Sequence, residues 1–207
     1  MTAWGILVAA GAGTRFGGPK QDALLGGVPL WSWALEALRA GGVDEVVVVG
    51  TPPGAIAGGA SRRESVAAGL TEVPDQVDLV LVHDAARPLL SPVLVSSVLA
   101  RLRLGDVDGV VPAVAVRDTL KVVQDGRIIR TVDRSRLVAV QTPQGFRADA
   151  LRAAHARPDD EDVTDDAGLV EAMGGLVVTV PGDPRNIKVT FPEDLALAEA
   201  LLAVDPG

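Results

Sequence analysis

The hydrophobic positions along the chain alternate between two kinds of segment. Short, nearly continuous apolar runs are typical of strands buried within a parallel sheet, whereas apolar residues spaced three and four apart are typical of helices. Strands are predicted at 4–10, 45–50, 78–83, 109–116, 137–141 and 176–180. Helices are predicted near 29–40, 62–70, 92–103, 148–156, 164–173 and 192–204.

This alternation of strands and helices indicates an α/β fold. Such connections build βαβ units, so we expect a Rossmann-like, mostly parallel twisted sheet with helices on both faces. At 207 residues the chain has the length of one domain, 1–207. Ligands of such sheets bind outside the carboxyl ends of the strands. Polar clusters follow the predicted strands, and these clusters therefore predict the functional site.

Residues 117–137 interrupt the alternation and predict a protruding β-ribbon. Asp125-Gly126 lies between two segments rich in β-branched residues, and this dipeptide is a strong hairpin signal. A two-stranded ribbon is only marginally stable by itself. We therefore expect a dimerisation arm that packs on a second copy of the chain. The alternative is an ordinary edge hairpin packed on its own domain.

A glycine-rich loop with two cations, residues 11–21, follows the first predicted strand. Glycine lets the backbone approach a ligand closely, and backbone N–H groups with Arg15 and Lys20 would form an anion site suited to phosphates. Phe16 replaces the third glycine of a dinucleotide-binding loop, and Pro19 replaces the glycine before the lysine of a P-loop. The loop predicts another kind of phosphate site, or else a plain strand-to-helix turn with solvated cations.

Composition narrows the class of protein. The formal net charge is −8 and aromatic residues make up 3% of the chain, which argues against nucleic acid as a partner. The chain has no cysteine, and no apolar run near its start is long enough to span a membrane. We expect a cytoplasmic protein that does not bind a membrane. Only three lysines are present, and Lys20 and Lys188 fall within polar clusters, so both are candidate phosphate ligands.

A second glycine cluster precedes the helix predicted at 62–70. Gly58-Gly59 again favours close approach of the backbone to a ligand. Ser61 is a candidate N-cap of that helix, with Glu64 as its capping-box partner. Capping accounts fully for Ser61, but it accounts neither for the paired glycines nor for Ser65.

Asp84 and Arg87 form a third cluster with His83, directly after an apolar strand. A carboxylate at the carboxyl end of a strand suits Mg²⁺ or a substrate hydroxyl. The guanidinium of Arg87 suits a phosphate or a structural ion pair. His83 by itself is more typical of a structural residue than of a catalytic one.

The polar clusters form one ordered pattern along the chain. In sequence order its pieces are Ala9-Ala10-Gly11, Gly13, Arg15, Pro19-Lys20-Gln21, Gly58-Gly59, Ser65-Val66, His83-Asp84, Arg87-Pro88, Asp118-Thr119, Lys121, Thr131, Asp133-Arg134, Thr142-Pro143-Gln144, Thr164-Asp165, Asn186, Lys188 and Pro192. Across essentially the whole chain this order resembles the cytidylyltransferases that act on 2-C-methyl-D-erythritol 4-phosphate. The glycine loop alone marks only the wider nucleotidyltransferase superfamily. Ala60 departs from the family pattern, which often has an acidic residue there, so a side-chain contact to cytosine is in doubt at this position.

The resemblance implies a homodimeric enzyme of non-mevalonate isoprenoid biosynthesis that uses CTP and Mg²⁺, or another divalent cation. Its reaction would join CTP and 2-C-methyl-D-erythritol 4-phosphate to give 4-diphosphocytidyl-2-C-methyl-D-erythritol and pyrophosphate. The catalytic residues it implies are Arg15, Lys20 and Lys188. The residues it implies for CTP are Ala9, Ala10, Gly11, Gly13, Gly59, Ser65 and Asp84, with Asp84 also a candidate metal ligand. For the acceptor they are Arg87, Thr119, Arg134, Thr142 and Thr164.

Other activities are compatible with parts of this pattern. A ribitol 5-phosphate cytidylyltransferase would share the loop and the fold, and another sugar nucleotidyltransferase would use a different base. A nucleotide-binding regulatory protein without turnover is a further alternative. A decayed site should have lost at least one of its charged residues, so this alternative is disfavoured by the joint presence of Arg15, Lys20, Asp84 and Lys188.

Overall fold

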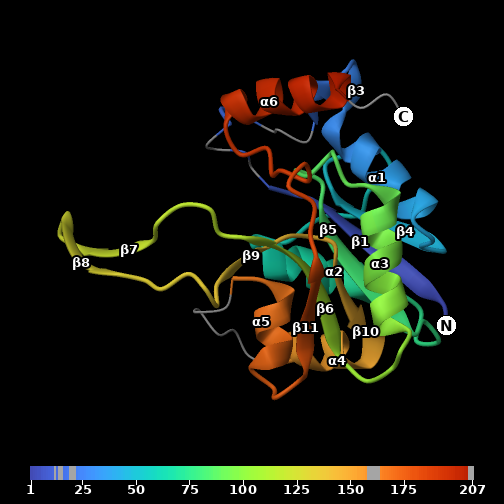
Figure 1. The fold of residues 1–207 in the computed structure, drawn as a ribbon. Helices are drawn as coiled ribbons and strands as arrows, with labels where there is room; N and C mark the ends of the chain where they lie inside the picture. The colour runs from blue at the N-terminus through green and yellow to red at the C-terminus, as the bar shows by residue number, and fades with distance from the viewer. Residues whose placement is uncertain (12, 14–15, 19–21, 158–163, 205–207) are drawn as a thin grey trace.

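The computed structural model describes residues 1–11, 13, 16–18, 22–157 and 164–204. Its centre is a seven-stranded sheet with the order β11-β6-β10-β5-β1-β4, and β9 pairs with β6 beside this path (Figure 1). The strands are β1 (Ala3–Ala9), β4 (Glu45–Gly50), β5 (Leu79–Asp84), β6 (Gly109–Ala115), β9 (Val138–Val140), β10 (Gln144–Arg147) and β11 (Val177–Pro181). A short hairpin of β2 (Leu24–Leu25) and β3 (Val28–Pro29) lies outside this sheet.

The strands β4, β1 and β5 run parallel and end side by side. Their near-continuous apolar sequences suit strands that are covered on both faces. In the register of the sheet, Ala9 of β1 pairs with Gly50 of β4, and Val8 pairs with Asp84 of β5. The three carboxyl ends therefore meet at one edge of the sheet, where the sequence predicted that polar residues would gather.

The sequence pattern does not predict β10. This strand, together with β9, which pairs antiparallel with β6, makes the sheet mixed. It lies between β5 and β6 and runs antiparallel to both. Its four residues begin with Gln144 and Gly145 and show neither an apolar run nor a clear alternation. Packing holds the strand in place, because Phe146 is fully buried and a Cβ on Gly145 would lie 2.6 Å from Val98 Cγ1 of α3. The α/β class itself is confirmed.

Helices cover both faces of the sheet, as the sequence predicts (Figure 1). On one face the core includes side chains of α1 and α3, and on the other it includes side chains of α2, α4 and α5. The helices are α1 (Leu30–Ala40), α2 (Arg62–Glu72), α3 (Pro92–Leu102), α4 (Ala148–His155), α5 (Asp166–Glu171) and α6 (Pro192–Ala203). Within the described ranges, none of them has the length and apolar character needed to cross a membrane.

A third, small core includes side chains of α6. Phe16 of the glycine-rich loop packs against this core, and so does Ile187, the neighbour of Lys188. The aromatic residue at position 16 therefore has a packing role, which explains why this loop departs from the dinucleotide-binding pattern. The buried members of the small core are Leu25, Leu30, Val189 and Ala198.

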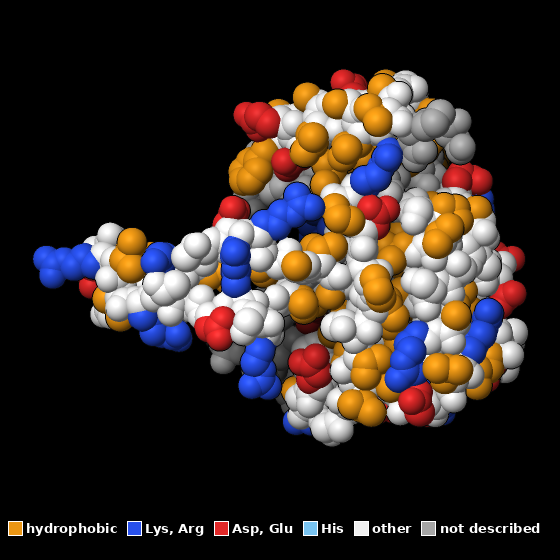
Figure 2. Space-filling model, viewed as in Figure 1, with side chains coloured by type: hydrophobic (Ala, Val, Ile, Leu, Met, Phe, Trp, Pro, Cys, Tyr) orange, Lys and Arg blue, Asp and Glu red, His pale blue; other side chains and the backbone are white. Residues whose placement is uncertain are grey.

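The predicted ribbon is present and projects away from the body of the molecule (Figure 1). It consists of β7 (Lys121–Gln124) and β8 (Arg127–Thr131), which pair antiparallel. Asp125 and Gly126 form the turn with φ angles of 50° and 76°, the left-handed conformation that such two-residue turns require. Figure 2 shows hydrophobic and cationic side chains exposed along this arm. The exposed large apolar residues of β7 and β8 are Val123, Ile128 and Ile129.

Candidate active site

The ends of β1 and β5 border a cavity of about 120 Å³. Ala9 and Gly11 line it from the end of β1 and the start of the glycine-rich loop, Asp84 from the end of β5, and Lys188 from the segment before α6. The structure thus brings together four residues from three distant segments of the sequence, and all four were predicted to belong to one site. Arg62, the first residue of α2, lines the same cavity and was not among the predicted site residues.

Asp84 lies between two cations. Lys188 Nζ donates to its Oδ2 at 2.6 Å, and Arg62 Nε donates to its Oδ1 at 3.0 Å. Burial alone would raise the pKa of Asp84, but the charges and hydrogen bonds of Arg62 and Lys188 hold it well below its usual range. The carboxylate is therefore ionised at neutral pH, and each of its oxygens accepts one charged hydrogen bond.

A chain of buried hydrogen bonds fixes the backbone at Asp84. Its N–H donates to Thr142 Oγ1 at 3.2 Å, Thr142 Oγ1 lies 2.9 Å from His83 Nδ1, and His83 Nε2 lies 3.2 Å from the carbonyl oxygen of Arg87. Burial lowers the pKa of His83 to about 4, so the ring is neutral at pH 7. All three contacts are satisfied when Nε2–H donates to Arg87 and Nδ1 accepts from the Thr142 hydroxyl. Thr142 therefore positions Asp84.

Backbone contacts hold the segment that carries Lys188 against the strand ends. The N–H of Val189 donates to the carbonyl oxygen of Ala86 at 2.8 Å. Asn186 Nδ2 donates to the carbonyl oxygen of Thr142, also at 2.8 Å. The chain is thus fastened on both sides of Lys188, while the side chain of Lys188 is 40% exposed. The backbone at Lys188 is therefore held in place, while the ammonium group at the end of the side chain can reach a ligand in the cavity.

The paired glycines bring the loop before α2 onto the end of β1. A Cβ on Gly58 would lie 2.5 Å from Ala10 Cβ, so a larger residue would push the loop away. The N–H of Gly59 donates to Ser65 Oγ at 3.1 Å, and this hydroxyl donates to the carbonyl oxygen of Ser61 at 2.9 Å. Ser65 therefore shapes the loop whose exposed backbone faces solvent beside Ala10.

The predicted cap of α2 is confirmed in part. Ser61 is the N-cap and its hydroxyl accepts from the N–H of Glu64. The Glu64 carboxylate does not complete the box at Ser61, because it accepts from the N–H of Ala60 at 2.5 Å. Ala60, where the family pattern often has an acidic residue, is thus held by its backbone in a fixed turn.

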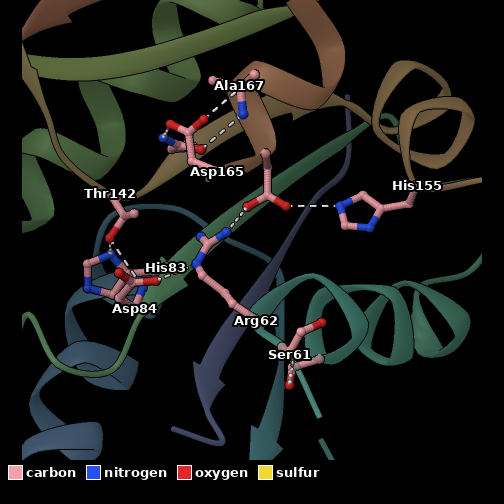
Figure 3. A network of polar contacts seen from close by, with 12 residues as sticks. Ser61, Arg62, His83, Asp84, Thr142, His155, Asp165 and Ala167 are labelled. Atoms are coloured by element: carbon pink, nitrogen blue, oxygen red, sulfur yellow. Dashed lines mark hydrogen bonds and ion pairs between the residues drawn. The ribbon is translucent and has the colours of Figure 1, made fainter. Parts of the chain in front are cut away.

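The segment that begins α5 is tied to β10. Asp165 caps the helix, with its side chain accepting from the N–H of Gly168 at 3.0 Å. Gln144 of β10 donates to Asp165 Oδ2 at 2.7 Å and accepts from the N–H of Ala167 at 3.2 Å. Figure 3 shows Asp165 and Ala167 near the network around Asp84. The neighbouring Thr164 is exposed and is therefore presented by a well-anchored turn.

Asp166 connects the turn at the start of α5 to Arg62, which lines the cavity at the ends of β1 and β5. Its Oδ2 accepts from Arg62 Nη1 at 2.7 Å, and its Oδ1 lies 2.9 Å from His155 Nε2 (Figure 3). Burial would raise the pKa of Asp166, but the hydrogen bond from His155 and the charge of Arg62 lower it. Arg62 therefore forms ion pairs with two carboxylates, Asp84 and Asp166.

The remaining predicted acceptor residues lie at or beyond the base of the arm. Thr119 and Arg134 are exposed on the segments that lead into and out of β7 and β8, and Arg134 Nη1 donates to the carbonyl oxygen of Arg117. A cavity of about 630 Å³ at the base of the arm is lined by Arg87, Lys188 and Arg117, among others. Within the single described chain, Thr119 and Arg134 are not among the residues lining this cavity.

The glycine-rich loop is described only in part. Gly13 has a φ angle of 63°, which favours glycine, and its carbonyl oxygen accepts from the N–H groups of Phe16 and Gly17 at 2.8 and 3.1 Å. Arg15 and Lys20, both predicted to be catalytic, lie outside the described residues.

Arg62, which forms ion pairs with both Asp84 and Asp166, was not predicted from the sequence. Arg62 follows the paired glycines and Ser61 in the sequence, but no role was predicted for it. Its position at the start of a predicted helix was a signal, because the helix dipole disfavours cations in the first helical turn. A basic residue at the first position of α2 therefore indicates a role outside the helix.

The fold and the site define a nucleotidyltransferase-type α/β protein, with a glycine-rich loop, a carboxylate and a lysine meeting at the ends of parallel strands. The sequence model of one family, 2-C-methyl-D-erythritol 4-phosphate cytidylyltransferase (IspD), matches residues 4–204. The match covers nearly the whole chain. The chain belongs to this family, as the order of its motifs predicted.

Individual relatives agree with this assignment. A 2-C-methyl-D-erythritol 4-phosphate cytidylyltransferase of Frankia casuarinae is 49% identical, and the match covers 98% of this chain and 82% of that protein. A bifunctional IspD/IspF enzyme of Oleidesulfovibrio alaskensis is 42% identical over 95% of this chain, which spans 57% of that longer protein. The crystal structure of the cytidylyltransferase from Thermus thermophilus superposes with a TM-score of 0.82 at 39% identity, covering 96% of this chain and 98% of that one.

Proposed function

We propose that the protein transfers a cytidylyl group from CTP to 2-C-methyl-D-erythritol 4-phosphate. The products are 4-diphosphocytidyl-2-C-methyl-D-erythritol and pyrophosphate, in non-mevalonate isoprenoid biosynthesis. Family membership supports the reaction, and one observation in the structure carries the site. Asp84 and Lys188 form a close ion pair at the mouth of a cavity bordered by Ala9 and Gly11.

The reaction needs charge neutralisation more than it needs a base. A phosphate oxygen of the acceptor, already anionic, forms a bond to the α-phosphorus of CTP. The bond from this phosphorus to the bridging oxygen of pyrophosphate breaks, and the electron pair leaves with pyrophosphate. Lys188 lies where its ammonium can move from Asp84 to an α-phosphate oxygen, and Arg15 and Lys20 of the loop are proposed for the other phosphate oxygens. Cations placed in this way stabilise charge that develops in the transition state.

Backbone groups dominate the proposed nucleotide site. Ala10 and Gly59 lie on two loops that approach each other closely because Gly58 has no side chain. The proposed CTP ligands are Ala9, Ala10, Gly11, Gly13, Gly59, Ser65 and Asp84. Ser65 acts by holding Gly59, since its hydroxyl already donates to the backbone of Ser61 and accepts from the N–H of Gly59.

A divalent cation, Mg²⁺ in the first instance, is proposed to accompany CTP. In the described part of the chain no three acidic, histidine or cysteine side chains gather into a metal site. Asp84 is the carboxylate at the cavity, and its two oxygens already accept from Arg62 and Lys188. If Lys188 moves to the nucleotide, Oδ2 of Asp84 becomes available. The site would then offer a cation one carboxylate oxygen, and substrate phosphates would hold it mainly, the usual arrangement for Mg²⁺. When bound, the cation would offset phosphate charge.

We propose a homodimer in which the arm completes the acceptor site of the partner. Apolar side chains of the arm are exposed in the single chain, with Ile128 65% and Ile129 56% accessible, and a second copy would cover them. Thr119 and Arg134 on the arm of one chain would then lie beside the acceptor residues on the body of the other chain. The residues proposed for the acceptor are Arg87, Thr119, Arg134, Thr142 and Thr164. Thr142 would act indirectly, by holding Asp84 and His83 in position.

We place the enzyme in the cytoplasm and propose no nucleic-acid partner. The net charge of −8 supports the second point, because a polyanion would repel the chain outside its cationic site. A purified preparation should contain no copurifying nucleic acid.

Pyrophosphate release tests the proposed reaction. The purified protein with CTP and a divalent cation is expected to release pyrophosphate when 2-C-methyl-D-erythritol 4-phosphate is added, and none without an acceptor. Ribitol 5-phosphate is the comparison acceptor. Release with ribitol 5-phosphate but not with the methylerythritol phosphate would overturn the acceptor assignment.

Arg134→Ala is expected to weaken acceptor binding selectively. The guanidinium is proposed to hold the acceptor phosphate as a planar fork, so the KM for the acceptor should rise about 10-fold or more while the KM for CTP stays near the wild-type value. Steady-state kinetics with each substrate varied in turn measure both constants. Equal increases in the two KM values would argue against an acceptor role for Arg134.

Mixing two defective variants tests whether the site is shared between subunits. Lys188→Ala damages the body and Arg134→Ala damages the arm. A mixed dimer then has one site with both changes and one site with neither. After unfolding and refolding an equal mixture, about a quarter of wild-type activity should return at low acceptor concentration, because half of random dimers are mixed. No gain over the separate variants would show that Arg134 serves its own chain, or that the protein is a monomer.

A further inference from the structure

Arg62 connects two cavities, each of which is lined by residues proposed for the reaction. Its Nε donates to Asp84 at 3.0 Å and its Nη1 donates to Asp166 at 2.7 Å (Figure 3). It lines both the 120 Å³ cavity that contains Asp84 and Lys188 and a cavity of about 170 Å³ that contains Thr164. One side chain therefore spans from the nucleotide side of the site to the acceptor side.

The end of this connection at Asp166 is rigid. Asp166 is 1% exposed and begins α5, and its second oxygen lies 2.9 Å from Nε2 of His155, whose side chain is 4% exposed. With Nε2–H donating, Nδ1 of His155 is a buried acceptor that has no hydrogen-bond partner in the described part of the chain. Asp166 is thus bonded on both sides and keeps Arg62 in one orientation.

The other cation on Asp84 is held differently. Lys188 is 40% exposed against 27% for Arg62, and lysine is a point charge on a flexible stem, whereas the arginine fork is planar. Of the two cations bonded to Asp84, only Lys188 is thus able to leave. Arg62 also occupies the first position of α2, where a cation opposes the helix dipole, so helix stability does not account for it.

We propose that Arg62 is a positioning residue for the transfer reaction. It holds Asp84 in place when Lys188 moves to the phosphates of the nucleotide, and through Asp166 it fixes the turn that presents Thr164 to the acceptor. The proposal rests on the proposed function, since it assigns Arg62 a part in that same site.

Loss of Arg62 has two physical consequences. Lys188 becomes the one remaining cation hydrogen-bonded to Asp84 among the described residues, and it is therefore held back from the phosphates. The turn at Thr164 also loses the ion pair between Arg62 and Asp166, which connects it to the cavity that contains Asp84 and Lys188. The backbone contacts proposed for CTP, at Ala10 and Gly59, remain. The kcat should fall and the acceptor KM should rise, with a smaller change in the KM for CTP.

Two variants separate positioning from folding. Arg62→Gln removes the cation and leaves Asp166 with the His155 contact alone. The double variant Arg62→Gln/Asp166→Asn also removes the buried charge, so the urea midpoint should return toward wild type. In both variants kcat should be about 100-fold lower, the size of effect expected when a reacting group is displaced by about 1 Å. Recovery of wild-type kinetics in the double variant would overturn the proposal.

Arg152→Gln is the matched control. Arg152 is an arginine of similar exposure, 31%, and it holds the opposite end of α2 by donating to the carbonyl oxygens of Leu70 and Val73. This variant should lower the urea midpoint and leave kcat and both KM values unchanged. If it reproduces the kinetic pattern of Arg62→Gln, loosening of α2 explains the effect and the positioning role is wrong.

A measurement without turnover keeps this proposal separate from the reaction itself. The chain has only three lysines, so labelling with an amine-acylating reagent can be read at Lys188 by mass spectrometry, with Lys121 as the internal reference. Arg62→Gln should reduce labelling of Lys188 about threefold, because Lys188 is then bound more tightly to Asp84. Unchanged labelling would refute the proposal. A wild-type protein that releases no pyrophosphate would refute the proposed reaction, and the labelling would still decide the role of Arg62.

Discussion

Lys188→Ala is expected to lower kcat by about 10²–10³-fold, the usual cost of removing one preorganised group that stabilises transition-state charge. Lys188 is the cation that faces the cavity from the segment before α6, and its ammonium lies 2.6 Å from Asp84. Folding should be little affected, because the side chain is 40% exposed and Arg62 still neutralises Asp84. Pyrophosphate release at saturating CTP and acceptor measures the effect.

Two comparison variants sharpen this prediction. Lys188→Arg keeps the positive charge and should recover part of the lost activity. Arg39→Ala removes an exposed cation that pairs with Glu36 on the surface of α1, and it should leave kcat unchanged. A Lys188→Ala enzyme that turns over at the wild-type rate would remove Lys188 from the site.

Asp166→Ala is expected to lower the free energy of unfolding by about 3 kcal/mol, at the lower end of the cost of breaking a buried ion pair. Asp166 is 1% exposed, and its loss leaves Arg62 without one of its two carboxylates and His155 without its hydrogen-bond acceptor. Because Arg62 keeps its contact with Asp84 and is 27% exposed, the penalty is limited by solvent. Urea denaturation followed by circular dichroism gives the value.

Asp149→Ala provides the comparison for this stability prediction. Asp149 forms an ion pair with Arg147, but its side chain is 71% exposed. Exposed pairs of this kind contribute little, so the change should stay within about 0.5 kcal/mol. A similarly small change for Asp166→Ala would mean that the buried network does not stabilise the fold.

The sequence predicted the parts of the fold that have strong periodicity. The apolar runs of β1 and β5 and the Asp125-Gly126 turn carry their structure locally, and the structure confirms each of them. β10 has no such local signal. It is a strand because the space between β5 and β6 accepts Phe146 and Gly145 there, which is a property of the packed core.

The candidate site was likewise predicted in part, where the signal is local in the sequence. Asp84 was recognisable because it follows a buried strand, and the parallel sheet then explains why it meets the end of β1. The contact of Arg62 with Asp166 joins residues 104 positions apart, and both were compatible with solvated charges at helix starts. The roles of Thr119 and Arg134 in acceptor binding stay predictions, because the proposed site for them includes a second chain.

In the proposed homodimer, the charge of the arm would also affect the encounter of two chains. Residues 117–137 contain six cations and three anions, a net charge of +3, so the rest of the chain, with its total of −8, carries −11. An arm of one chain is therefore attracted to the body of another over distances of about a Debye length, 8–10 Å. Such attraction speeds encounter and weakens as salt is added. In the proposed homodimer, the cations that flank Ile128 and Ile129 would thus guide the exposed apolar tip toward the acidic body of the partner and away from its arm.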